Sequence, residues 1–259
     1  MSVDLHNHTP LCNHAEGELF KYVEKAIESG TKYFGFSDHA PMDFDPKYRM
    51  SFSQMSQYEK EVLTLKERYK ESIEILLGYE VDYLKNHMDK KVLNADIDYL
   101  IGSIHFLEGW GFDNPEFIGK WEEQNIDEIW QKYFDTIEEM ANSRLFDIVG
   151  HFDLIKIFKF LPKGDINKMA KNALLAIKKS GMVLELNVAG YRKPIEEAYP
   201  SKSLLQQAYD LGIPITFASD AHKPEQVSMF KADIYNLAKS VGYKECAYFR
   251  KRKIEFVEF

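Results

Sequence analysis

The sequence predicts an α/β fold with a mainly parallel sheet, in a single domain that spans residues 1–259. Short runs rich in β-branched and aromatic residues alternate with amphipathic segments of helix length, which is the order of consecutive strand–helix–strand units. A length of 259 residues is common for one α/β barrel, and no repeat, linker or low-complexity tract divides the chain. A hydrophobic fraction of 45% is sufficient for a packed core.

About seven strand–helix units follow one another along the chain. The expected strands are residues 3–6, 33–37, 73–80, 99–105, 146–151, 182–187 and 215–220. The expected helices are residues 16–29, 53–69, 127–143, 165–180, 201–211 and 225–241. In the first helix Leu19, Tyr22 and Val23 share one face, and Gly30 follows as a terminator. The final segment, 253–259, is compatible with one more edge strand.

Composition excludes several classes of protein. The 33 basic and 41 acidic residues give a net charge of −8, which argues against nucleic-acid or anionic-membrane partners. Cys12 and Cys246 are too few for a disulfide framework and fit a reducing cytoplasm. The early position of His6 leaves no room for a signal peptide, and no apolar run suggests a membrane span. We therefore expect a cytoplasmic protein, and the sequence does not indicate its oligomeric state.

Seven of the eight histidines and two acidic residues stand at the ends of expected strands or in the loops that follow. These residues are His6, His8, His14, His39, Glu80, His105, His151, Asp220 and His222. Since the carboxyl ends of barrel strands open onto one face, we expect the nine side chains to converge there. Any one of these histidines could equally have a structural role, but nine such placements together favour a metal site.

The ligand types suit zinc, iron or manganese, and a bridging carboxylate can hold two ions. His6 and His8 are two residues apart on the first strand, so both imidazoles point to one side. Asp4 lies two residues before His6, so its side chain points to the same side of the strand, and we expect it to orient one of these imidazoles. His87 lies in a polar helical stretch and is expected to be a surface residue.

Nearly the whole chain resembles the polymerase and histidinol phosphatase (PHP) superfamily. The motifs that carry this resemblance are Asp4-x-His6-x-His8, His14, Ser37-Asp38-His39, Gly78-Tyr79-Glu80, Ser103-Ile104-His105, Gly150-His151-Phe152-Asp153 and Asp220-Ala221-His222. The histidinol-phosphate phosphatase branch is the most similar, on the loops Ser37-Asp38-His39-Ala40-Pro41, Gly109-Trp110-Gly111-Phe112-Asp113, Arg192-Lys193-Pro194 and Tyr199-Pro200-Ser201.

The resemblance implies a distorted TIM-like (β/α)₇ barrel with three divalent metal ions. It implies one ion bound by His6, His8, Glu80 and Asp220, a second by Glu80, His105 and His151, and a third by His14, His39 and His222. Zinc, iron and manganese are all compatible with these ligands. The implied reaction is the hydrolysis of L-histidinol phosphate to L-histidinol and phosphate, in histidine biosynthesis.

For this reaction, metal ions would activate water and clamp the phosphoryl group. Three residues are the candidates for catalysis: Glu80 fixes the metal pair, Asp220 or a bound water protonates the leaving alkoxide, and Arg192 grips a phosphate oxygen through its planar fork. Candidate substrate contacts besides Arg192 are Trp110, Asp113, Tyr199 and Ser201. The aromatic residues could instead pack their loops, and Ser201 could cap the next helix.

Other functions also fit parts of this pattern. An amidohydrolase-type enzyme would also begin with His-x-His, but it would usually need a bridging lysine where this chain has Glu80. A nuclease or polymerase proofreading module is disfavoured by the acidic charge. A metal-binding protein without activity would be expected to lack some ligands. The alternative within the superfamily is a phosphoesterase acting on another small phosphate ester or on nucleic-acid ends.

Overall fold

The computed structural model describes residues 1–259, and seven parallel strands form its central barrel. In order around the barrel, the strands are β1 (Val3–Asp4), β2 (Tyr33–Phe36), β3 (Glu74–Asp82), β4 (Tyr99–Ser103), β7 (Ile148–Val149), β8 (Val183–Asn187) and β9 (Ile215–Ala218). Backbone hydrogen bonds from Leu5 N to Phe217 O (3.0 Å) and from His8 N to Ala221 O (2.9 Å) join the first strand to the last. The expected (β/α)₇ barrel is therefore confirmed.

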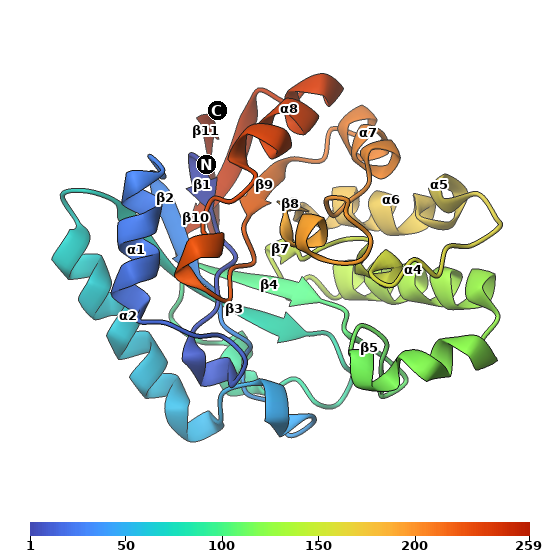
Figure 1. The fold of residues 1–259 in the computed structure, drawn as a ribbon, viewed down its shortest axis with the longest axis horizontal. Helices are drawn as coiled ribbons and strands as arrows, with labels where there is room; N and C mark the ends of the chain where they lie inside the picture. The colour runs from blue at the N-terminus through green and yellow to red at the C-terminus, as the bar shows by residue number, and fades with distance from the viewer.

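Helices surround these strands, with α1 and α2 beside β2 and β3 and with α4 and α6 beside β7 and β8 (Figure 1). Their bounds are α1 (Leu19–Glu28), α2 (Met55–Tyr69), α3 (Lys90–Leu93), α4 (Ile126–Ser143), α5 (Ile166–Met169), α6 (Lys171–Ser180), α7 (Lys202–Asp210) and α8 (Lys231–Val241). None of the helices is both long and apolar enough to cross a membrane.

Two helices differ from the sequence-based expectation. The segment 165–180 forms two helices, α5 and α6, which meet at the buried Ala170. The helix expected from residue 225 begins only at Lys231, after a short 3₁₀ turn at Pro224–Gln226. Ser228 (φ 56°) and Phe230 (φ 57°) adopt left-handed backbone conformations, which a continuous right-handed helix cannot contain.

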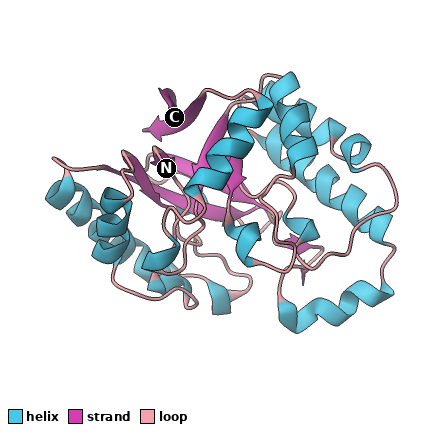
Figure 2. Cartoon of the chain, turned by 45° about the horizontal axis from the view of Figure 1, so that its top comes forward, coloured by secondary structure: helices cyan, strands magenta, loops and turns pink.

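A C-terminal hairpin covers the amino end of the barrel. It consists of β10 (Glu245–Arg250) and β11 (Lys253–Glu258), so the single edge strand expected at 253–259 has a partner that the sequence did not reveal. Arg250 pairs with Glu74, Arg252 pairs with Asp147, and the backbone N–H of Lys251 donates to Asp98. These three acids stand at the starts of β3, β4 and β7, and both chain termini lie at this end (Figure 2).

The barrel interior is closed beneath the carboxyl face by Tyr99, which is fully buried. Its hydroxyl donates to Leu5 O at 2.5 Å. Its ring packs over Gly35 and Gly78, where an added Cβ would lie 2.0 and 2.6 Å from atoms of Tyr99. The two glycines therefore make room for a large side chain at this level, and polar residues gather above it.

On the carboxyl face, the loop after β4 forms a second hairpin from β5 (Phe106–Leu107) and β6 (Trp110–Gly111). A nine-residue 3₁₀ helix, Pro115–Glu123, follows it. Both elements form part of the wall around the functional site described next.

Candidate metal centre

The nine residues expected to bind metal converge at the carboxyl end of the barrel. We call them the histidine cluster: His6, His8, His14, His39, Glu80, His105, His151, Asp220 and His222. Glu80 lies at its centre and is 1% exposed. Its Oε2 is 3.3 Å from His6 Nε2 and 3.0 Å from His39 Nδ1, whereas its Oε1 is 3.0 Å from His151 Nε2. A single carboxylate thus contacts imidazoles that come from three different strands.

Within this cluster the ligand atoms form three compact groups, each spanning less than 4.8 Å: His6, His8 and Glu80; Glu80, His105 and His151; and His14, His39 and His222. Asp220 Oδ1 joins the first group at 3.2 Å from His8 Nε2. In the other two groups, Nε2 of His105 is 3.1 Å from Nε2 of His151, and Nε2 of His14 is 3.0 Å from Nε2 of His222.

The inner nitrogens are free for metal because the outer ones are already engaged. Nδ1 of His6 bonds to Glu185 (2.7 Å), Nδ1 of His8 to Asp38 (3.3 Å) and Nδ1 of His105 to Asp82 (2.6 Å). Nδ1 of His14 and of His222 faces the carbonyl oxygens of Cys12 (2.8 Å) and Asp220 (3.2 Å), respectively. A carboxylate or carbonyl behind the imidazole is the usual arrangement around metal-binding histidines. The donor set therefore fits divalent metal ions.

Charge also favours cation binding. Burial opposes ionisation of Glu80 and Asp220, but the surrounding imidazoles outweigh burial and hold the pKa of both carboxyls well below its usual range. Burial likewise disfavours protonation of His8, yet its contacts with Asp220 and Asp38 raise its pKa to about 9. Without a bound metal ion, this imidazole therefore holds a proton that the metal must displace.

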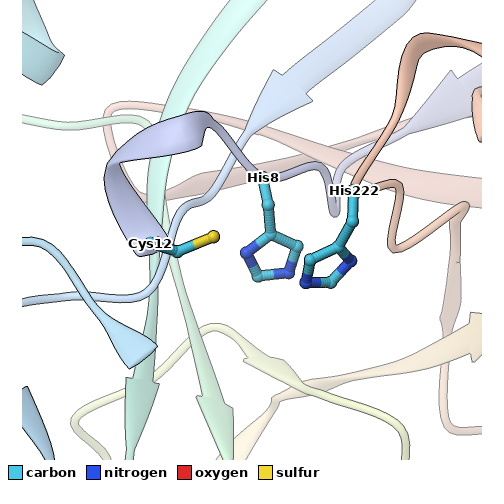
Figure 3. Close-up of side chains that lie close together, drawn as sticks. All are labelled: His8, Cys12 and His222. Carbon is cyan, nitrogen blue, oxygen red and sulfur yellow. The ribbon is translucent and has the colours of Figure 1, made fainter. Parts of the chain in front are cut away.

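Cys12 lies beside the cluster but does not complete a fourth group. Its thiol is near ring nitrogens of His8 and His222, as Figure 3 shows. The two imidazoles stack face to face, with ring centroids 4.1 Å apart and planes inclined by 23°. Because nitrogen lone pairs lie in the ring plane, the lone pairs of stacked rings do not converge on one ion. Burial also raises the pKa of the Cys12 thiol, which disfavours the thiolate that a metal would need.

The cluster forms one end of a cavity of about 550 Å³, which all of its members except His6 line. Arg192 is also part of the wall. Its Nη2 donates to the carbonyl oxygens of Ser219 and Asp220, both at 2.8 Å, and its Nη1 is buried without a hydrogen-bond partner. These bonds hold the backbone at Asp220, whose φ of 49° is in the left-handed region.

Only some of the other expected substrate contacts reach this cavity. Asp113 and Tyr199 line it, and the Tyr199 hydroxyl has no hydrogen-bond partner. Trp110 is instead buried against Trp121, with ring centroids 5.0 Å apart, and Ser201 donates its backbone N–H to Asp153 at the start of α7. The expectation that Trp110 and Ser201 contact the substrate therefore does not agree with this placement.

Comparison with known proteins identifies the family. The model of the PHP domain matches residues 4–189. The chain belongs to the PHP domain family. A probable histidinol-phosphatase of Deinococcus radiodurans is 37% identical over 257 residues, covering 97% of this chain and 98% of the relative. The histidinol-phosphatase of Bacillus subtilis is 29% identical over 256 residues, covering 86% of this chain and 94% of the relative.

Solved structures show the same PHP fold. The histidinol phosphate phosphatase of Lactococcus lactis, complexed with zinc, L-histidinol and phosphate, has a TM-score of 0.81 and 22% identity, with 98% of each chain covered. The putative histidinol phosphatase of Listeria monocytogenes has a TM-score of 0.80 and 24% identity, covering 89% of this chain and 99% of that one. Arg192, Asp220 and His222 lie beyond the matched residues 4–189, but the fold brings them to the same cavity.

Three carboxylates orient imidazoles of the histidine cluster, and sequence reasoning missed this role for all of them. They are Asp38, Asp82 and Glu185. Asp4, which the sequence predicts for that role, instead accepts hydrogen bonds from the backbone N–H and hydroxyl of Ser219. The available signal was an acidic residue within or beside an apolar strand, as at Glu185 in Val183–Asn187.

His87 stands apart from the PHP site, as expected of a surface residue. Its Nδ1 pairs with Asp43 Oδ1 at 2.7 Å, and about a third of its side chain (35%) is exposed. Among the eight histidines it is the one that belongs to none of the compact ligand groups.

Proposed function

We propose that this chain is a divalent-metal-dependent histidinol-phosphatase, which hydrolyses L-histidinol phosphate to L-histidinol and phosphate in histidine biosynthesis. Residues 1–259 would act as one catalytic domain. The observation that carries the proposal is the histidine cluster, which shares one cavity with the guanidinium group of Arg192. Relatives with this activity in their names align over most of the chain.

The proposed centre holds three ions, one in each compact group of the cluster, with Asp220 completing the first group. Glu80 is the proposed bridge between the first two ions. Ions of this kind lower the pKa of water to about 7 and neutralise phosphoryl oxygens. Zinc, iron and manganese are the candidate metals, and the Lactococcus lactis protein is described as a zinc complex.

Arg192 is the proposed phosphate clamp. The two hydrogen bonds of its Nη2 fix the plane of the guanidinium group, which leaves Nη1 for a phosphate oxygen. Asp220 has a strongly lowered pKa, because the positive imidazoles around it outweigh its burial. An ionised Asp220 is suited to bind metal but carries no proton to donate, so the leaving alkoxide would take its proton from water.

Asp113 is the proposed anchor for the positive end of the substrate. The other carboxylates that line the cavity each face an arginine, a lysine or an imidazole, whereas Asp113 has no ion-pair partner. Burial raises the pKa of the Asp113 carboxyl, with His105 acting in the opposite direction. An arriving ammonium or imidazolium group would offset the cost of this buried charge. The free hydroxyl of Tyr199 is the proposed hydrogen-bonding partner for the same end of the substrate.

A phosphatase assay with three substrates tests this proposal. Protein purified without chelators is assayed with L-histidinol phosphate, p-nitrophenyl phosphate and a short DNA oligonucleotide, beside metal analysis of the same sample. We expect metal-dependent hydrolysis with a clear preference for L-histidinol phosphate. Comparable rates on all three substrates, or a preference for the DNA ends, would contradict the assignment.

The variant Asp113→Asn separates recognition of the amine from the chemistry. It should raise KM for L-histidinol phosphate but leave KM for p-nitrophenyl phosphate unchanged, since that ester has no positive group. His87→Ala is the matched control, because His87 lies on the surface outside the cluster, and it should change neither value.

A further inference from the structure

Glu185 is a fully buried acid on β8 that lies outside the proposed set of metal ligands. Its Oε1 is 2.7 Å from His6 Nδ1. Its Oε2 accepts the backbone N–H of His151 at 2.8 Å and the side-chain amide of Asn187 at 2.9 Å. Each oxygen of this carboxylate therefore forms a hydrogen bond with a different member of the histidine cluster.

Asn187 extends this contact to a third member of the cluster. It is two residues beyond Glu185 on the same strand, so both side chains point into the barrel. Its Nδ2 donates to Glu185 Oε2 and, at 3.2 Å, to Asp220 Oδ2, and its Oδ1 accepts the backbone N–H of Ala189 at 2.7 Å. All of its side-chain polar atoms are thus engaged.

We infer that Glu185 and Asn187 form a positioning pair, which holds His6, His151 and Asp220 in the arrangement that binds metal. The inference rests on the metal centre of the proposed function, since it concerns the proposed ligands of two different ions. These ligands follow β1, β7 and β9, and β8 is hydrogen-bonded to both β7 and β9. The pair therefore connects three ligand-bearing strands at the height of the metal site.

The carboxylate matters because it can only accept hydrogen bonds. It holds a proton on Nδ1 of His6, which leaves Nε2, 3.3 Å from Glu80 Oε2, as the nitrogen that would bind metal. A glutamine at position 185 has one acceptor oxygen for three donors. With its NH₂ toward His6, the proton of His6 would move to Nε2 and block metal binding. With its NH₂ reversed, two donors would face each other at the His151 N–H.

Glu185→Gln is the decisive variant, and Asp147→Asn is its matched control. Asp147 is a poorly exposed acid that also accepts a backbone N–H, from Leu100 at 2.8 Å, but it lies at the amino end of the barrel. Zinc affinity of each metal-depleted protein is measured by competition with a chromophoric chelator, and stability is measured by urea unfolding of the same samples.

We expect Glu185→Gln to weaken zinc binding by about 10- to 100-fold, the usual effect of removing a group that orients a metal ligand. Asp147→Asn should keep wild-type zinc affinity, even if its urea unfolding midpoint falls by as much as that of Glu185→Gln. Asn187→Ala, which keeps the Glu185 carboxylate, should give a smaller loss of affinity and keeps the test valid if Glu185→Gln does not fold.

Unchanged zinc affinity in both Glu185→Gln and Asn187→Ala would overturn the inference, as would an equal loss in Asp147→Asn or a wild-type protein that binds no zinc. The measurement requires no substrate. A wild-type protein that binds zinc but does not hydrolyse L-histidinol phosphate would therefore contradict the proposed function alone.

Discussion

Replacement of Arg192 tests the phosphate clamp most directly. In Arg192→Ala, the phosphate loses one charge-assisted hydrogen bond from Nη1, which is worth about 1.5–3 kcal/mol. At about 1.4 kcal/mol per factor of ten, this loss corresponds to a rise in KM of about 10- to 150-fold. Because the contact is made in the bound substrate as well as in the transition state, kcat should change less than KM.

The same side chain also supports the metal site, through its bonds to the carbonyl oxygens of Ser219 and Asp220. Arg192→Lys separates the two roles, since lysine restores a positive charge but not the planar fork that can bind both carbonyls and a phosphate. We expect the KM of this variant to lie between those of Arg192→Ala and the wild type. The backbone at Asp220 should be held little better than in Arg192→Ala.

Steady-state kinetics and metal content are measured on the same preparations of both variants. A rise in KM with full metal content supports the clamp. Loss of metal with an unchanged KM would show that Arg192 only supports the backbone at Asp220. Full recovery by lysine would refute the argument that the fork is required.

Three further predictions concern other parts of the molecule. Zinc affinity of the metal-depleted protein should fall as the pH is lowered from 9 to 6, because the metal must displace a proton from His8, whose pKa is raised to about 9. An affinity that does not change with pH in a competition titration would contradict this. Gly190→Ala should lower kcat/KM by about 10- to 100-fold with full metal content. The added Cβ would lie 1.9 Å from Glu197 O and displace the turn that carries Arg192. Wild-type kinetics of this variant would contradict the prediction. Arg252→Ala should reduce the free energy of unfolding, measured in urea, by about 1–2 kcal/mol without changing activity. The reason is that it leaves the poorly exposed Asp147 without its guanidinium partner. Unchanged stability would show that this contact of the C-terminal hairpin contributes little to the free energy of unfolding.

The ligand types and their placement were predictable because they depend on a property of the fold class. Every parallel strand of a barrel ends on the same face, so a histidine or acid at a strand end can be placed without knowledge of its neighbours. His6, Glu80 and His151 are adjacent in the structure for this reason, although they are far apart along the chain.

The partners of individual side chains were not predictable in the same way. Asp4 bonds to Ser219 because of how β1 lies against β9, a relation that no local pattern records. Trp110 does not line the cavity because it lies on the opposite face of the short hairpin formed by β5 and β6. In that hairpin Phe106 pairs with Gly111 and lines the cavity, so Trp110, the neighbour of Gly111, faces the other side. A shift of one residue in such a hairpin reverses every side chain.

The charges of the site explain why a phosphatase of this kind would need its metal ions before its substrate. Asp38, Asp82 and Glu185 stand behind the imidazoles, and Glu80 and Asp220 lie among them. The guanidinium group of Arg49, which also lines the cavity, is already paired with Asp82 at 2.9 Å.

Without metal, the two cations of the cavity wall that have no ion-pair partner, Arg192 and Lys193, would have to attract a phosphate dianion into a region where carboxylates outnumber free cations. Bound divalent ions reverse this balance, because a cation is often the largest charge in its site. The acidic groups that fix the imidazoles thus make the cavity unfavourable for phosphate until metal is bound, which couples substrate binding to metal occupancy.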